Sequence, residues 1–240
     1  MYDVLIIGAG PGGIFSAYEL IRQNPQLKVG VFEAGHELNK RKCPIDGKKF
    51  KTCIGCKSCS IMSGFGGAGA FSDGKYNITN DFGGTLYEYI GKKNALELMR
   101  YVDDINMAFG GEGTKLYTTA GSHIKKMCLQ NDLHLLDASV RHLGTDINYV
   151  VLENLYAYLK EKVDFFFDTP VETVRVTEDG YELTARGQTF SCKDCVISVG
   201  RSGSKWMENI CRELQIPTKS NRVDIGVRVE MPAEVFSHLT

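Results

Sequence analysis

Three glycines near the start of the chain have the spacing of a phosphate-binding turn. Gly8, Gly10 and Gly13 form Gly-x-Gly-x-x-Gly directly after an apolar run and directly before a helical pattern. The first glycine permits a tight turn, the second lets a pyrophosphate approach the backbone, and the third lets helix and strand pack closely. The first turn of the helix presents free N–H groups to the anion, and Pro11, which itself has no N–H, and Gly12 begin that turn beside it. A flexible turn is the alternative for the glycines alone.

An acidic residue narrows the choice of nucleotide. Glu33 follows a second apolar run, at the position where an acidic side chain accepts hydrogen bonds from both ribose hydroxyls. It would repel a 2′-phosphate, so we expect FAD or NAD rather than NADP. Glu33 and Ala34 are therefore predicted to bind the cofactor together with the glycine turn.

Four cysteines lie close together in the next segment. Cys53, Cys56 and Cys59 have the spacing Cys-x2-Cys-x2-Cys, and Cys43 lies ten residues before the first of them. Four such thiolates are predicted as ligands of zinc or an iron-sulfur cluster. Ordinary reduced thiols and a flavin-linked redox pair are the alternatives. A second pair with the same spacing, at 192 and 195, is interpreted as structural because it leads into a buried strand.

A glycine-rich loop follows the cysteines. It contains Gly64, Gly66, Gly67, Gly69 and Gly74, and such a loop can fold its amides around an anion or lie against a flat ring. We expect it beside the flavin or its pyrophosphate, with Gly66 and Gly67 in contact; a flexible hinge is the alternative.

Three polar residues lie just before a later helical pattern. Arg141, His142 and Asp146 would bind an anionic substrate or move a proton in one interpretation. In the other they are the solvated, capped start of a helix. No catalytic acid or base is identified among them.

The periodicity of apolar residues predicts the elements that hold these groups. A strand, helix and strand over 3–33 form one βαβ unit, and an irregular excursion covers 35–91. The remaining predicted elements are helices at 95–109, 147–159 and 202–214 and strands at 163–167, 171–177, 181–185, 188–192, 195–199 and 223–230.

These elements predict an α/β fold with a doubly wound parallel sheet, a βαβ dinucleotide-binding unit and an antiparallel β-meander crossover. We expect a discontinuous FAD-binding domain over 1–34 and 146–220, with a long inserted Gly/Cys-rich and helical segment at 35–145. The start of a second, truncated domain is expected at 221–240.

Composition excludes several function classes. The chain has 240 residues, with 28 basic and 29 acidic side chains and a net charge of -1, so no nucleic-acid or membrane partner is expected. No apolar stretch is long enough to cross a bilayer, and we expect no signal peptide before the first strand. Eight cysteines without an export signal favour reduced thiols and a cytoplasmic location.

The arrangement resembles the glutathione-reductase-like superfamily of FAD-dependent oxidoreductases. In that resemblance the meander replaces a crossover helix, Val171 contacts adenine through its backbone, and Gly200 belongs to a second glycine signature. The resemblance implies FAD rather than NAD as the bound cofactor.

A closer resemblance extends over nearly the whole chain. The segments SGFGGAGAFSDGK (63–75), RHLGTD (141–146), GRSGSKW (200–206) and DIGVRVE (224–230), with Cys43-Pro44, resemble a family described as FAD-dependent or NAD-utilising dehydrogenases. This implies a dehydrogenase-type flavoenzyme with NAD(P)H as a candidate electron donor and a small-molecule substrate or electron-transfer partner. It implies no particular substrate.

Two other functions and the extent of the chain stay open. A non-catalytic FAD- or NAD-binding module that senses redox state or binds a partner is one alternative, and a cysteine-ligated metal protein on a nucleotide-binding scaffold is another. The superfamily completes its sheet with a strand ending in Gly-Asp, which we do not find after Gly200. We therefore expect an N-terminal portion of a flavoprotein that binds flavin weakly and tends to associate.

Overall fold

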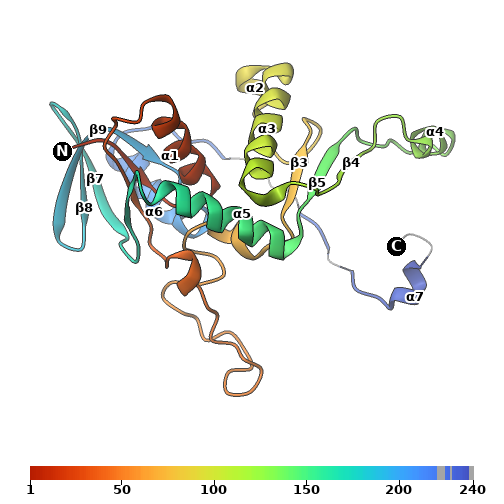
Figure 1. The fold of residues 1–240 in the computed structure, drawn as a ribbon, viewed down its shortest axis with the longest axis horizontal. Coiled ribbons are helices and arrows are strands. Elements are labelled where there is room, and N and C mark those ends of the chain that lie inside the picture. The colour runs from red at the N-terminus through yellow and green to blue at the C-terminus, as the bar shows by residue number, and fades with distance from the viewer. Residues whose placement is uncertain (221–224, 228, 238–240) are drawn as a thin grey trace.

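A six-stranded sheet forms one end of the molecule (Figure 1). The computed structural model describes residues 1–220, 225–227 and 229–237. The sheet has the order β6-β2-β1-β9-β8-β7, in which β6, β2, β1 and β9 are parallel and the β7-β8-β9 meander is antiparallel. Its strands are β1 (Tyr2–Ile7), β2 (Val29–Phe32), β6 (Asp164–Phe166), β7 (Val171–Thr177), β8 (Gly180–Ala185) and β9 (Gln188–Ile197). The predicted α/β class, the βαβ unit and the meander are confirmed.

The last strand differs from the prediction of two separate strands. β9 is continuous over ten residues: its first half pairs antiparallel with β8, and its second half pairs parallel with β1. The polar pair Lys193-Asp194 suggested a break, but it lies within the strand. Lys193 forms an ion pair with Asp3 of β1, with 2.7 Å between Nζ and Oδ1, so this polar pair is compatible with an extended backbone.

Helices and the meander cover both faces of the parallel strands. α1 (Pro11–Gln23) and α5 (Gly144–Leu159) pack on one face, where Val4 and Ile6 point. The meander and α6 (Ser204–Glu213) pack with Leu5 and Ile7 on the other. Because both faces are buried, β2 and the last four residues of β1 are continuously apolar rather than alternating.

The segment between β2 and α5 contains a second sheet that was not predicted. Its strands β3 (Lys75–Ile78), β5 (Ser139–His142) and β4 (Leu116–Thr118) are antiparallel in the order β3-β5-β4. Strands of three or four residues are too short to show a period of two. Figure 1 shows α5 running between the two sheets. Beside the second sheet are α2 (Tyr87–Ile90), α3 (Lys92–Asn106), a π-turn (Met107–Gly111) and α4 (His123–Gln130).

Several boundaries differ from the sequence-based expectations. α5 begins at Gly144, three residues before the predicted start at 147, and has no side-chain cap. The strand expected at 223–230 lies partly outside the described residues, and its described part, 225–227 and 229–230, is not in a strand. A short helix, α7 (Ala233–Phe236), follows. Within the described ranges, no helix is long and apolar enough to cross a membrane.

Candidate functional site

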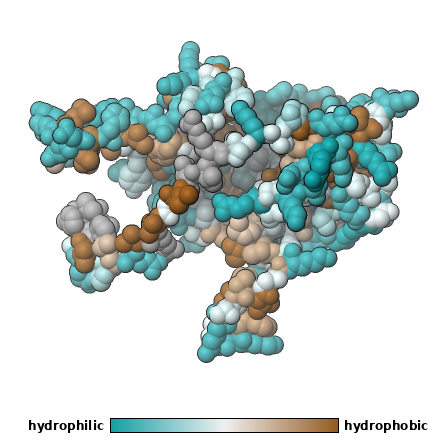
Figure 2. Space-filling model, turned by 180° about the vertical axis from the view of Figure 1, so that it is seen from behind, coloured by the Kyte–Doolittle hydropathy of each residue, from teal (hydrophilic) through white to brown (hydrophobic). Residues whose placement is uncertain are grey.

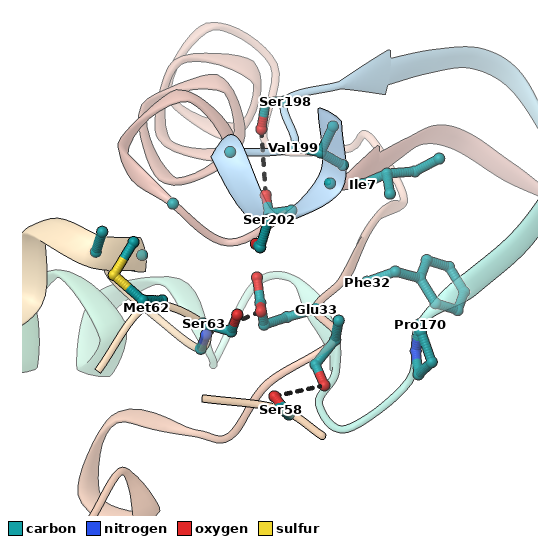
Figure 3. Close-up of a pocket in the computed structure, with 18 of the residues that line it drawn as sticks. Ile7, Phe32, Glu33, Ser58, Met62, Ser63, Pro170, Ser198, Val199 and Ser202 are labelled. Carbon is teal, nitrogen blue, oxygen red and sulfur yellow. Dashed lines mark hydrogen bonds between the residues drawn. The ribbon is translucent and has the colours of Figure 1, made fainter. Parts of the chain in front are cut away.

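A cavity of about 940 Å³ opens at the carboxyl ends of the parallel strands (Figure 3). Ile7, Phe32 and Ser198, which end or follow β1, β2 and β9, all line it. Open α/β sheets bind ligands at this edge. The predicted cofactor-binding residues in its wall are Gly8, Gly10, Pro11, Gly12, Glu33, Ala34, Gly67, Val171 and Gly200. Gly13 and Gly66 are not in the wall.

The three glycines of the turn have different structural roles. Gly8 has a φ of +103°, and a Cβ there would lie 2.7 Å from the Ser198 carbonyl oxygen. A Cβ on Gly13 would lie 1.9 Å from the Gly8 carbonyl oxygen. At Gly10, by contrast, the nearest atom is the Gly67 Cα, at 3.9 Å. Gly8 and Gly13 are therefore required by the fold itself, whereas Gly10 leaves space open in the cavity wall.

Glu33 is buried, at 8% exposure, and its carboxylate joins three loops. One oxygen accepts the Ala9 N–H at 2.8 Å, and the other accepts those of Gly35 at 2.8 Å and Gly64 at 2.9 Å. Figure 3 shows Glu33 in the middle of the cavity lining. A carboxylate has about four acceptor positions, so one remains for a ligand. Glu33 thus organises the site as well as facing it.

Arg41 stabilises the same wall, a role that its position within a basic run does not indicate. It is only 4% exposed and donates to the carbonyl oxygens of Ser60 at 2.9 Å, Ile61 at 2.9 Å and Phe65 at 2.6 Å. Burial lowers the pKa of Arg41, and the negative charge of Glu33 partly offsets this shift. The buried guanidinium therefore anchors the segment before the glycine loop and balances the charge of the site.

The glycine-rich loop is held as a wall of the cavity. The Gly66 N–H donates to the Ala9 carbonyl at 2.8 Å. Asn148 of α5 is buried and donates from Nδ2 to the Gly69 carbonyl at 2.9 Å, while its Oδ1 accepts from Tyr76 Oη at 3.0 Å. Gly67, Ala68 and Gly69 line the cavity, so the structure favours a fixed wall over a hinge.

One part of the cavity wall is apolar. Its surface there is formed by side chains at the ends of β1 and β2, the β6–β7 connection and the start of α6: Ile7, Phe32, Pro170, Val171, Val199 and Trp206. Trp206 is oriented by a 3.1 Å hydrogen bond from its indole N–H to the Glu172 carbonyl. A flat aromatic group of a ligand would contact these apolar atoms. A polar group next to it in the same ligand would reach Glu33.

Arg141 has a structural partner that neither interpretation from sequence included. Its guanidinium binds both carboxylate oxygens of Asp103, with 2.7 Å between Nη2 and Oδ2, and also the Thr114 carbonyl. The two side chains are 13% and 7% exposed. Hydrogen bonding to Asp103 raises the pKa of Arg141. The Arg141 side chain therefore links β5 to α3. His142, by contrast, is exposed.

The four cysteines of the predicted metal site do not form a ligand group. Cys43, Cys53 and Cys56 are exposed, Cys59 is partly buried, and all four are free thiols. Across the described ranges, no three His, Cys, Asp or Glu side chains are grouped as metal ligands would be. Metal binding by these residues stays a prediction.

The remaining Cys-x2-Cys pair should be chemically inert. Burial raises the pKa of the Cys195 thiol to about 12 and also raises that of Cys192. Because the thiolate is the reactive form, alkylation at pH 8 should label Cys43, Cys53 and Cys56 rapidly and spare 192 and 195 until the protein is unfolded. Mass spectrometry of the labelled peptides measures this, and rapid labelling of the pair in the folded protein would contradict it.

Comparison with known proteins identifies the fold. No protein-family model matches the sequence, and no curated protein matches it. Among solved structures, a glycine oxidase from Geobacillus kaustophilus aligns over 90% of this chain and 59% of its own, with a TM-score of 0.52 and 17% identity. A glycine oxidase from Bacillus cereus ATCC 14579 aligns over 89% and 59%, with a TM-score of 0.47 and 13% identity. The chain thus spans less than two thirds of these enzymes, and it has the fold of the corresponding part of the Geobacillus oxidase.

Proposed function

We propose that the chain is the nucleotide-binding part of an FAD-dependent oxidoreductase. The observation that carries this proposal is the convergence of the glycine turn, the Glu33 carboxylate and an apolar surface on one cavity. Its volume of about 940 Å³ lies near the upper end of the range for ligand sites, about 300–1,000 Å³, which suits a large dinucleotide.

Each part of the cavity has a role in this proposal. The open backbone at Gly10 and the free N–H groups of the first turn of α1 would hold the pyrophosphate. The remaining acceptor position of Glu33 would bind a ribose hydroxyl, and Phe32, Val171 and Trp206 would contact adenine. Bound FAD supplies hydride or electron transfer, and the protein orients it. NAD(P)H is the proposed electron donor, with a small molecule as substrate or an electron-transfer partner as acceptor.

The experiment is reconstitution of the purified chain with FAD. We expect saturable binding with a shifted visible absorption spectrum, anaerobic bleaching by NAD(P)H and recovery of colour with oxygen. Binding without reduction by NADH or NADPH would favour a non-catalytic FAD-binding module. The absence of any FAD binding would contradict the proposal.

Replacing Glu33 tests its double role. Glu33→Ala should weaken FAD binding by about 1.5–3 kcal/mol, the usual range for hydrogen bonds to a charged group. It should also lower the free energy of unfolding, because three buried N–H groups lose their acceptor.

A second substitution should give intermediate values of both effects. Glu33→Gln retains one acceptor oxygen and should lie between the parent and Glu33→Ala in both properties. Fluorescence titration with FAD and urea denaturation measure them, and an unchanged dissociation constant in Glu33→Ala would remove this side chain from the binding site.

A further inference from the structure

The cysteine-rich loop, residues 40–59, contributes two residues to the cavity wall. Lys57 and Ser58 both line it, and Ser58 Oγ donates to the Ala34 carbonyl at 3.5 Å. Figure 3 shows Ser58 on the Glu33 side of the cavity. Cys56 and Cys59 immediately flank these two residues. A covalent change at these two sulfurs would therefore act on the wall itself.

The backbone distinguishes this pair from its neighbour in sequence. The chain bends at Lys57 and Ser58, the two residues between Cys56 and Cys59, but has no bend over 53–56. A disulfide requires its Cα atoms to lie within about 4.4–6.8 Å, and a bend between residues i and i+3 brings their Cα atoms toward each other. The geometry thus favours pairing of Cys56 with Cys59 over pairing with Cys53.

The two thiols also differ in access. Cys56 is exposed and Cys59 is partly buried. The Cys59 carbonyl accepts the N–H groups of Met62 at 2.9 Å and Ser63 at 2.8 Å, which fixes its backbone. An exposed thiol is the one that a reagent reaches first, and the neighbouring anchored thiol is placed to complete the exchange.

The loop is strongly basic in a chain with no excess of positive charge overall. Residues 40–59 contain seven lysines or arginines and one aspartate, although the whole chain has a net charge of -1. Figure 2 shows this loop projecting from the body with a hydrophilic tip. A positive field at the thiols attracts anionic small molecules and raises their local concentration.

We propose that Cys56 and Cys59 are a thiol–disulfide modification site in the wall of the nucleotide cavity, oxidised by small anionic disulfides of the glutathione class. The Cys56 sulfur attacks one sulfur of the oxidised reagent, forms a mixed disulfide and releases one glutathione thiol. The Cys59 sulfur then attacks Cys56 and releases the second. Two protein thiols become one disulfide, one reagent disulfide becomes two thiols, and the protons pass to the released thiols.

Trypsin provides a direct test, because it cleaves after Lys51, Lys57 and Lys75. The full chain is equilibrated with mixtures of reduced and oxidised glutathione, quenched with acid, alkylated and digested. A disulfide between Cys56 and Cys59 links peptide 52–57 to peptide 58–75, whereas one between Cys53 and Cys56 stays inside peptide 52–57.

The variants complete the test. The linked peptides should persist in the matched control Cys53→Ser, and they should be lost in Cys59→Ser, which should instead accumulate a glutathione adduct on Cys56. Linkage that disappears in Cys53→Ser, oxidation confined to peptide 52–57, or no linkage at any mixture would overturn the proposal. The proposal would also be overturned if the thiols reacted only after a chelator had removed bound zinc or iron. The experiment needs no FAD, so its failure is distinct from failure of the proposed function.

Discussion

Gly10→Val should weaken FAD binding at least about 100-fold, which corresponds to roughly 2.7 kcal/mol, while the protein stays folded. Gly10 lies in the cavity wall with an extended backbone (φ -76°, ψ -175°) that a β-branched residue adopts easily. The nearest atom to an added Cβ is 3.9 Å away. The new methyl groups therefore meet little protein and occupy the space through which a pyrophosphate approaches the backbone.

A graded series shows whether the effect is steric. Gly10→Ala adds only one carbon atom and should lose less affinity than Gly10→Val, while both variants should match the parent in thermal unfolding within a few degrees. Fluorescence titration with FAD gives the dissociation constants, and circular dichroism gives the midpoints. Equal affinity of the parent and Gly10→Val would show that the pyrophosphate does not bind at this turn.

The parts of the site that the sequence predicted are local in the chain. A strand, a glycine turn, a helix and a second strand lie within the first 33 residues, so the spacing of Gly8, Gly13 and Glu33 reports their relation in space. The same holds for the meander, whose turns at Asp179-Gly180 and Arg186-Gly187 connect adjacent strands.

The parts that sequence reasoning missed depend on contacts between distant residues. Arg141 and Asp103 are 38 positions apart, and Asn148 binds a carbonyl 79 positions away. Arg41 lies between two lysines and resembles a solvated charge until the carbonyls of 60–65 surround it. No periodicity encodes such pairings, because each residue type is also common on exposed surfaces. Three local patterns were misread as well: the polar pair inside β9, the short strands of the second sheet and the start of α5.

Gly13→Ala should strongly destabilise the protein, lowering the free energy of unfolding by about 3 kcal/mol, the upper end for overpacking. An added Cβ would lie 1.9 Å from the Gly8 carbonyl oxygen and 3.1 Å from Ser198 Oγ. The first of these is a backbone atom, so no side-chain rotation relieves the contact. α1 must instead move away from β1, which weakens the packing of Ile14 and Ala17 against the sheet.

The adjacent residue provides the matched control. Gly12 lies in the same helical turn, and an added Cβ there would meet nothing closer than the Ser198 Cβ at 3.2 Å. Gly12→Ala should therefore cost less than about 1 kcal/mol, because alanine's higher helix propensity offsets a mild contact. In thermal unfolding, Gly13→Ala should lower the midpoint by about 6–12 °C, given roughly 2–4 °C per kcal/mol for a chain of this size. Equal midpoints for the two variants would mean that α1 does not depend on its close approach to β1, and the structural role assigned to Gly13 would then be wrong.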